Sequence, residues 1–427
     1  MRPGSLHGGH EPLRAAVESD RAGPAVPAGP GQGRGPVGNV QFTDFSKLDL
    51  GRLPSPCFVV DEVAVERNLR ILRQVADASG ARVLAALKAF SMWRLAPLVS
   101  RYLHGTCSSG LHEARLGSEY YGGEVHVFSA AYSEQSLREI LNLADHVVFN
   151  SCGQWQRFAP LIKAAREQRA GLEFGLRINP EHSEGTVPIY DPCAPGSRLG
   201  IPLSQLDESA LEGISGLHFH TLCEQDFPPL QRTLDVVEER FGHLLPRMRW
   251  VNFGGGHHIT RPGYQIDDLV ARIRDFSNKY HVQVYLEPGE AVAIGTGVLV
   301  AEVLDLTWNQ VNQAILDTSA TCHMPDTLEM PYRPDILGAG TADTLPHSYR
   351  LGGLTCLAGD VIGDYSFEQP LQIGQRLVFS DMAHYTMVKT STFNGTHLPA
   401  IALWNSLTDE LELVREFGYN DFRERLS

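Results

Sequence analysis

The sequence predicts an α/β protein in which a (β/α)8 TIM barrel is followed by a mostly β domain. Two observations support this prediction: short β-prone runs alternate with helical stretches through the middle of the chain, and the helical periodicity stops after residue 290. Strands that alternate with helices form parallel sheets with right-handed crossovers. Eight such units are the number that closes a barrel.

The expected elements follow one another in order. The eight expected strands are 83–88, 104–109, 125–129, 146–151, 173–179, 216–222, 249–254 and 282–288. The expected helices are 93–102, 111–121, 134–144, 154–167, 227–245 and 266–280. An open doubly wound sheet is the alternative. Such a sheet normally has a glycine-rich turn after its first strand, whereas here the turn reads Lys88-Ala-Phe-Ser-Met.

The two ends of the chain differ from this middle part. Beyond residue 290, β-prone runs separated by glycine-rich turns predict a β-rich domain. The first 40 residues contain nine glycines and six prolines. They hold too few large apolar side chains to offset the entropy lost when the segment is ordered. We therefore expect a disordered leader over 1–45 (or a start site placed too far upstream), a barrel over 46–290 and a β-rich domain over 291–427. An early strand at 57–60 is expected to join the β-rich domain.

Composition narrows the class of function. Lys plus Arg number 36 and Asp plus Glu number 50, and the resulting charge of −14 disfavours binding to a phosphate backbone but suits a cationic small molecule. No apolar run approaches the roughly 18–20 residues of a membrane span, and no secretory signal is visible. The seven cysteines are dispersed without a CxxC pair. We expect a cytoplasmic protein with reduced thiols and no structural metal.

Lys88 ends the first expected strand, after Val-Leu-Ala-Ala-Leu. Active sites of such barrels lie at the carboxyl ends of the strands. A lysine that follows an apolar strand is expected to be partly desolvated, which lowers its pKa and favours a neutral amine able to form a Schiff base. The alternative is a lysine that only marks the exit of the strand into solvent.

Two further features fall at strand ends. His218 and His220 alternate in Gly-Leu-His-Phe-His-Thr, so both side chains point to the same face. They could hold a metal or stack on an aromatic cofactor, or one could be a buried structural histidine. Gly254, Gly255 and Gly256 follow the seventh strand, where bare backbone amides can approach a phosphate, although a plain turn has the same composition.

Glu287 ends the eighth strand in Tyr-Leu-Glu-Pro-Gly-Glu. A buried carboxylate there would keep a heteroaromatic nitrogen protonated, which makes a pyridoxal ring an electron sink, but it could equally be a salt-bridge partner. Arg177 and Tyr385 are possible cofactor contacts, although a structural role is favoured for each taken singly. Cys356, in a glycine-flanked loop, is either a proton donor or an inert thiol.

Together these motifs resemble the fold-type III pyridoxal-phosphate decarboxylases, which combine an alanine-racemase-like barrel with a β domain. The resemblance covers about residues 50–425 and is strongest to the carboxynorspermidine (carboxyspermidine) decarboxylases. It implies pyridoxal 5'-phosphate as cofactor. It also implies a homodimer with the active site at its interface.

The resemblance also assigns roles to individual residues. Ala-Leu-Lys-Ala-Phe matches the Schiff-base motif, and Thr-Cys-Leu-Ala-Gly-Asp matches a catalytic loop supplied by the partner subunit. The implied cofactor contacts are Lys88, Arg177, His220, Cys223, Gly254, Gly255, Gly256, Glu287 and Tyr385. The implied catalytic residues are Lys88 and Cys356, and Asp360 is implied as a functional residue of the loop.

Departures from the wider family bear on the substrate. Relatives commonly carry Arg where this chain has Glu290, and diaminopimelate decarboxylases carry Cys-Glu-Ser-Gly-Asp where it has Cys356-Leu-Ala-Gly-Asp. Losing an arginine and gaining an acid favours a substrate whose far end is an ammonium group. Glu290, Asp326, Glu329 and Asp360 are the expected substrate contacts, although a solvated acidic loop is an alternative for Asp326 and Glu329.

The predicted activity is therefore the decarboxylation of carboxynorspermidine or carboxyspermidine to norspermidine or spermidine. Alternatives are a diaminopimelate, ornithine or arginine decarboxylase of the same fold and, less favoured, a racemase. A non-catalytic pyridoxal-binding protein or an inhibitor-like relative is also possible. The β-rich region that follows the barrel argues against the first of these two, and the presence of both Lys88 and Cys356 argues against the second.

Overall fold

The computed structural model describes residues 43–427, so almost all of the expected leader lies outside the described residues. Eight parallel strands form a closed ring, because β5 pairs with β6 as well as with β4. The ring strands are β2 (Arg82–Ala86), β3 (Gly105–Ser108), β4 (Glu124–Phe128), β5 (His146–Phe149), β6 (Glu173–Asn179), β8 (Gly216–His218), β9 (Trp250–Asn252) and β10 (Gln283–Leu286). Each coincides with a predicted strand, so the predicted TIM barrel is confirmed.

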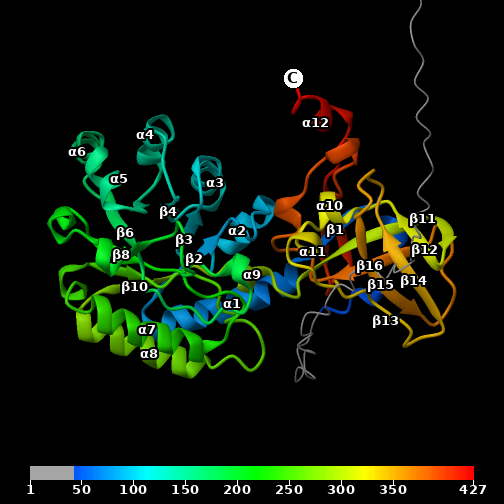
Figure 1. Ribbon diagram of the computed structural model, residues 1–427, viewed down its shortest axis with the longest axis horizontal. Helices are drawn as coiled ribbons and strands as arrows, with labels where there is room; N and C mark the ends of the chain where they lie inside the picture. The colour runs from blue at the N-terminus through cyan, green and yellow to red at the C-terminus, as the bar shows by residue number, and fades with distance from the viewer. Residues whose placement is uncertain (1–42) are drawn as a thin grey trace, which may run out of the picture. The chain divides into compact units, whose positions relative to one another are not determined.

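Helices surround the ring on its outer side (Figure 1). They are α1 (Glu62–Ser79), α2 (Ala96–Val99), α3 (Leu111–Leu116), α4 (Glu134–Leu143), α5 (Cys152–Arg157), α6 (Ala159–Gln168), α7 (Phe227–Phe241) and α8 (Ile266–Tyr280). The expected helix 154–167 is two helices, because Pro160 lies in the first turn of α6 and a proline cannot continue the interior of a helix. Short helices follow: α9 (Glu290–Ala293), α10 (Ala320–His323), α11 (Asp326–Glu329) and α12 (Tyr419–Arg423).

Helix α1 is a feature that the sequence interpretation did not assign. Asp61 caps it by accepting a hydrogen bond from the backbone of Val63, and Gly80 ends it at φ 78°. Its apolar face, which includes Leu69 and Leu72, is buried in the barrel core. Both capping signals were present in the sequence.

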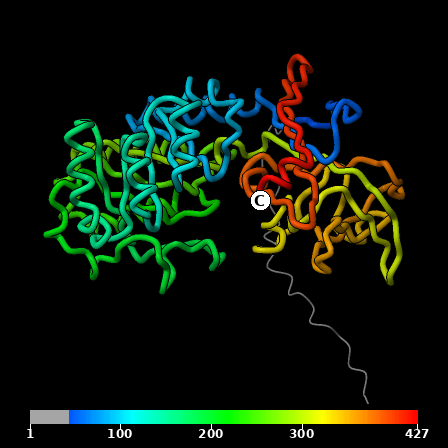
Figure 2. The backbone as a smooth tube through the Cα atoms, turned by 90° about the horizontal axis from the view of Figure 1, so that it is seen from above, coloured from blue at the N-terminus to red at the C-terminus, as the bar shows by residue number. Residues whose placement is uncertain are grey.

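The structure also contains the predicted β-rich part. Its sheet runs in the order β13-β15-β14-β12-β11-β1-β17-β18, with β16 paired to β11. The strands are β1 (Cys57–Asp61), β11 (Gly297–Asn309), β12 (Val311–Leu316), β13 (Ala339–Thr341), β14 (His347–Gly352), β15 (Val361–Phe367), β16 (Arg376–Ser380), β17 (Ala400–Asn405) and β18 (Glu410–Arg415). The early strand β1 pairs with β11 on one side and with β17 on the other. The blue start of the described chain accordingly lies among the yellow to red segments of the β-rich part (Figures 1 and 2). The short strand β7 (Ile201–Pro202) extends the barrel sheet beside β6.

An apolar plug fills the inside of the barrel. Leu84, Val148, Trp250 and Tyr285 form a buried cluster from four different strands. The Trp250 ring occupies the space beside Gly216, where an added Cβ would come within 2.0 Å of it. The stacked rings of His126 and His146 pack beside Trp250 and Tyr285, so side chains fill the barrel and leave no open pore.

Candidate active site

The polar residues predicted for the site lie where the carboxyl ends of the strands meet. Lys88 follows β2, His218 ends β8, Gly254 follows β9 and Glu287 follows β10. All strands of the ring are parallel, so these ends share one mouth. The structure therefore brings together residues that are up to about 200 positions apart in the sequence.

Glu287 is fixed by two side chains. Its Oε1 accepts a hydrogen bond from Asn252 Nδ2 at 2.7 Å, and its Oε2 lies 3.3 Å from His218 Nε2. Burial alone would raise the pKa of Glu287, but the contacts with His218 and Asn252 lower it to about 2. Burial lowers the pKa of His218, so a neutral ring donates its Nε2–H to an ionised carboxylate. Glu287 is thus a buried negative charge suited to a cationic nitrogen.

His220 presents a neutral, flat ring at the same mouth. Its Nδ1 accepts a hydrogen bond from the Gly255 backbone at 3.0 Å. Burial lowers the pKa of His220 well below its ordinary value, and the positive charge of Lys88 lowers it further. The ring can therefore stack on an aromatic ligand without carrying a charge of its own.

The three glycines make the turn after β9 possible. Gly254 and Gly256 have φ of 71° and 84°, in the region that favours glycine. A Cβ on Gly255 would lie 2.1 Å from the carbonyl oxygen of Glu287, and one on Gly256 would lie 1.9 Å from that of Leu222. Three strand ends approach one another here through bare backbone.

Lys88 differs from the expectation in one respect. Its side chain is exposed, because the strand ends at Ala86 and Lys88 stands in the turn beyond it, so the expected partial desolvation is wrong for this structure. Lys88 nevertheless lies near the site residues, since its charge lowers the pKa of both His218 and His220. The turn is held from the β-rich part, where the Tyr385 backbone donates a hydrogen bond to Ala89 O at 2.8 Å.

Arg177 lies beneath the site. Its Nη2 donates a hydrogen bond to His220 O at 3.1 Å, and its guanidinium lies 4.6 Å from the centre of the Phe128 ring. Burial lowers the pKa of Arg177 to about 10, although Glu287 acts in the opposite direction. Arg177 therefore remains a cation and fixes the backbone of His220.

Comparison with known proteins identifies the family. A family profile described as "Pyridoxal-dependent decarboxylase, C-terminal sheet domain" matches residues 57–383. The chain belongs to this family of pyridoxal-dependent decarboxylases. The predicted resemblance is thereby confirmed, and the chain is a carboxy-lyase.

Relatives within the family are similar over nearly their whole length. The chain is 46% identical over 379 residues to carboxyaminopropylagmatine decarboxylase of Synechocystis, covering 88% of this chain and 96% of that protein. It is 43% identical over 385 residues to carboxynorspermidine/carboxyspermidine decarboxylase of Campylobacter jejuni, covering 88% and 99%.

Two solved structures show the same fold. Carboxynorspermidine decarboxylase from Campylobacter jejuni, in complex with norspermidine, superposes with a TM-score of 0.80 at 42% identity, covering 87% of this chain and all of that one. Diaminopimelate decarboxylase from Helicobacter pylori has a TM-score of 0.73 at 16% identity, covering 88% and 97%, and is similar in fold alone.

Glu290, one of the predicted substrate contacts, is engaged by two histidines of the same chain. His258 Nε2 lies 3.1 Å from Glu290 Oε2, and His384 Nε2 lies 3.7 Å from Oε1. Burial alone would raise the pKa of Glu290, but His384 and His258 lower it. Burial alone would lower the pKa of His384, but Asp381 and Glu290, with a smaller contribution from Glu224, raise it to about 9. Glu290 is thus the centre of a buried network.

Asp326 and Glu329 lie on α11 and share one cation. Lys389 Nζ bonds to Asp326 Oδ1 and lies 2.8 Å from Glu329 Oε2, and Tyr190 donates its hydroxyl hydrogen to Asp326 at 3.0 Å. Two carboxylates on one ammonium leave a net negative charge. Asp326 also lies near the acids around Glu290. Burial raises the pKa of Tyr332, and the negative charges of Asp326, Asp381 and Glu224 raise it further, so all three carboxylates are close to this one hydroxyl.

Cys356 is exposed in the loop between β14 and β15. None of the hydrogen bonds or ion pairs recorded between residues 43 and 427 joins its thiol to the barrel mouth. Asp360 in the same loop is buried, and its oxygens accept hydrogen bonds from Ser319, Thr321 and Thr355. Those bonds occupy the carboxylate of Asp360, so its contacts in this chain position the loop rather than reach outward.

Tyr385 and Cys223 complete the predicted set. Tyr385 adopts φ 46°, and its pKa is raised by burial first and then by Glu290 and Cys223, so all three lie close together. Burial raises the pKa of Cys223 to about 12, so it is a neutral thiol. Both residues line the same end of the site as the network around Glu290.

Several residues of the site were not predicted. Asn252 donates a hydrogen bond to Glu287. Cys107 on β3 also lies near Glu287, since burial and the charge of Glu287 raise the pKa of Cys107 well above its ordinary value. Strand alternation was the signal that could have found them: Cys107 and Asn252 occupy inward-facing positions next to strand ends. His257, His258 and His384 gave no comparable local signal.

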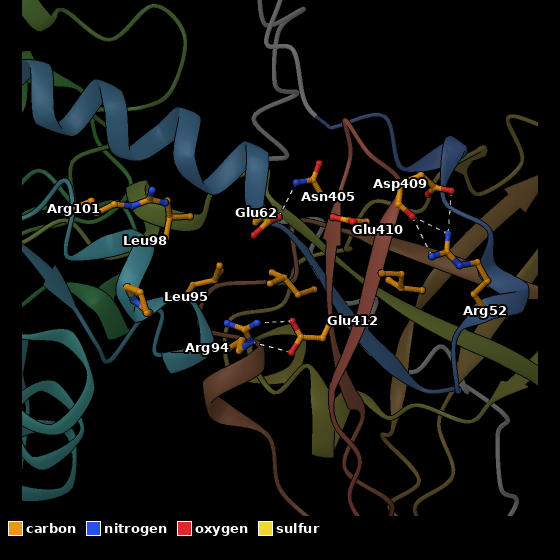
Figure 3. Close-up of a pocket in the computed structure, with 13 residues that line it drawn as sticks. Arg52, Glu62, Arg94, Leu95, Leu98, Arg101, Asn405, Asp409, Glu410 and Glu412 are labelled. Carbon is orange, nitrogen blue, oxygen red and sulfur yellow. Dashed lines mark hydrogen bonds and ion pairs between the residues drawn. The ribbon is translucent and has the colours of Figure 1, made fainter.

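A separate hollow of about 780 Å³ lies away from this mouth (Figure 3). It is bordered by Leu95 and Leu98 from the barrel side and by β17 and β18. Arg94 makes two hydrogen bonds to Glu412, at 2.9 and 2.8 Å, across it. None of the predicted site residues lines it.

Among the helices of residues 43–427, none is both long enough and apolar enough to cross a membrane.

Proposed function

We propose that the protein decarboxylates carboxynorspermidine or carboxyspermidine to norspermidine or spermidine, with pyridoxal 5'-phosphate as cofactor. The observation that carries the proposal is the excess of carboxylates at the far side of the site. Glu290, Asp326 and Glu329 gather there, with Lys389 and His384 as their cationic partners. A substrate with an amino-acid head and a distal ammonium matches that charge.

The residues at the barrel mouth fit the cofactor. The turn Gly254 to Gly256 carries no Cβ, so its backbone can approach a phosphate closely. In this structure the amides of Gly254 and Gly255 donate to Asn252 Oδ1 and His220 Nδ1. His220 would lie against one face of the ring, and Glu287 would hold the proton on the ring nitrogen. Lys88, near His220 and open to the mouth, would be the amine that binds the cofactor covalently. Bound pyridoxal phosphate supplies the electron sink for the pair released when carbon dioxide leaves.

The side chains would divide the remaining work. Ionised Glu287, held by Asn252 and His218, would keep its paired nitrogen protonated throughout the reaction. Cys356 of the partner subunit would then deliver a proton to Cα, a contribution of roughly 10²–10⁴-fold for a positioned acid. Glu290 and α11 would hold the distal amines.

The homodimer belongs to the same proposal. Leu354, Leu357 and Phe393 surround Cys356 and are 49%, 46% and 46% exposed. Exposed apolar side chains around a thiol form a surface suited to a second copy of the chain. Through that contact each copy would supply Cys356 to the other's barrel.

A second candidate substrate is carboxyaminopropylagmatine. The Synechocystis relative that acts on it is 46% identical to this chain. The distal group of carboxyaminopropylagmatine is a guanidinium, which carboxylates such as Asp326 and Glu329 could bind in bidentate fashion.

A substrate panel tests both. Purified enzyme loaded with cofactor is assayed for carbon dioxide release from carboxynorspermidine, carboxyspermidine, carboxyaminopropylagmatine and diaminopimelate. We expect kcat/KM for a carboxylated polyamine to exceed that for diaminopimelate by at least about 100-fold, the effect of about 3 kcal/mol of charge preference. Equal or better turnover of diaminopimelate would contradict the proposal.

A further inference from the structure

The loop that carries Cys356 is exposed, yet its backbone is anchored. It spans residues 353–360 between β14 and β15. Asp360 closes its base: Gly353 N donates to Asp360 O at 3.0 Å, and Thr355 donates from its backbone and its hydroxyl to Asp360 Oδ2 at 3.1 and 2.7 Å. Ser319 Oγ clamps the same carboxylate from outside the loop at 2.9 and 3.0 Å.

A second anchor reaches Cys356 itself. Asn394 Oδ1 accepts a hydrogen bond from the backbone N–H of Cys356 at 2.8 Å, from a segment 38 residues further along the chain. This is the contact that fixes the middle of the loop, whereas Asp360 fixes its base. The backbone segment of Asn394 is itself tied to α10, because Ser391 N donates to Cys322 O at 2.8 Å.

Asn394 satisfies two requirements at once. Its backbone adopts φ 58° and ψ 13°, a left-handed conformation that asparagine tolerates better than most side chains. Its side-chain oxygen is placed to accept the Cys356 amide. Glycine would satisfy the first requirement only, whereas aspartate would satisfy both.

We infer that Asn394 is a positioning residue for Cys356, and that it sets where the thiol stands when the loop meets its target. The inference rests on the proposed function for the role of the thiol as a proton donor. The anchoring of the loop can be measured without that function. Asn394 acts through Cys356 and does not touch the reacting atoms.

The test compares Asn394→Gly with Asn394→Asp in the full-length holoenzyme. Hydrogen–deuterium exchange of the peptide that contains Cys356 reports the anchor directly. Loss of the acceptor should speed exchange of that amide by at least about tenfold in Asn394→Gly and leave it unchanged in Asn394→Asp. The kcat of Asn394→Gly should fall by about tenfold or more with KM within about twofold, because only proton delivery is misplaced.

Asn394→Asp should restore kcat, since a carboxylate oxygen at the same position keeps the acceptor for the Cys356 amide. Equal kcat in the two variants, or a loss that tracks the backbone conformation and not the acceptor, would overturn the inference. Cys356→Ala separates the two ideas. Full activity in that variant would remove the thiol from the proposed function, while the exchange data would still report the anchor.

Discussion

At the scale of single residues, the site depends on charges that are held before any ligand binds. Glu287 is ionised because two neighbours donate hydrogen bonds to it, and His220 is neutral because it is buried near Lys88. Prearranged charges of this kind need no reorganisation when a ligand arrives. Lys88, by contrast, is a reactive group with an exposed side chain.

Replacement of Lys88 should therefore separate cofactor attachment from folding. We expect Lys88→Ala to fold with an unchanged Tm, because the side chain is exposed, but to lack the visible absorbance of the bound cofactor. Turnover should fall by several orders of magnitude with the loss of the covalent amine. Lys47→Ala, another exposed lysine, is the control. A normal cofactor spectrum in Lys88→Ala would contradict the assignment.

His384 provides a prediction about alkaline pH. Its pKa in the folded protein, about 9, is above the ordinary value of 6.5. The charged form of His384 therefore stabilises the folded protein fully below pH 6.5. This contribution to the free energy of unfolding, on the order of 3 kcal/mol at most, is lost as the pH rises through about 9. The stability of His384→Asn should depend less on pH over this range. Urea unfolding of both proteins at pH 7 and pH 10 measures the difference, and parallel changes would contradict the charged pair with Asp381 and Glu290.

At the scale of elements, the glycine turn after β9 packs directly against the backbone at the end of β10. Glu287 N donates to Gly254 O at 2.8 Å, so the glycine turn and the end of β10 form one unit. The position of the Glu287 carboxylate thus depends on the absence of side chains in the neighbouring turn.

We expect Gly255→Ala to disturb that unit. The new Cβ would overlap the carbonyl of Glu287 at 2.1 Å, which should cost roughly 1–3 kcal/mol and weaken cofactor binding. Gly171→Ala is the matched control, because a Cβ there meets nothing within 4 Å. Cofactor titration and thermal unfolding measure the two effects. An equally mild outcome for both variants would show that the turn can relax.

At the scale of the whole molecule, the proposed donor and the barrel mouth lie in different parts of the chain. Cys356 stands in a loop of the β-rich sheet among exposed apolar residues. A homodimer that exchanges these loops would bring each thiol to the other barrel.

Subunit mixing tests this arrangement. Lys88→Ala and Cys356→Ala homodimers should each be nearly inactive. When the two are mixed and allowed to exchange, one site in a heterodimer would contain both native residues, so up to about a quarter of wild-type activity should return, as symmetric subunit exchange requires. Leu357→Asp should weaken association in sedimentation experiments. No recovery from a mixture that demonstrably exchanges subunits would contradict a shared site.

Much of the architecture was accessible from the sequence. The alternation of strands and helices predicted the closed ring, because these patterns arise from interactions within short stretches of chain. The same patterns placed Lys88, His220 and Glu287 at one mouth. They did not predict α1, although Asp61 and Gly80 cap it. They also did not predict the exposure of Lys88, which depends on the length of its turn.

The sequence by itself therefore determined the order of the elements and the end of the barrel at which the chemistry lies. Only the tertiary structure decided which partners those residues have. Asn252 on Glu287, His258 and His384 on Glu290, and Asn394 on Cys356 are contacts between distant segments. Periodicity reports the face on which a side chain lies, but hydrogen-bond geometry and burial depend on how separate segments approach one another in space.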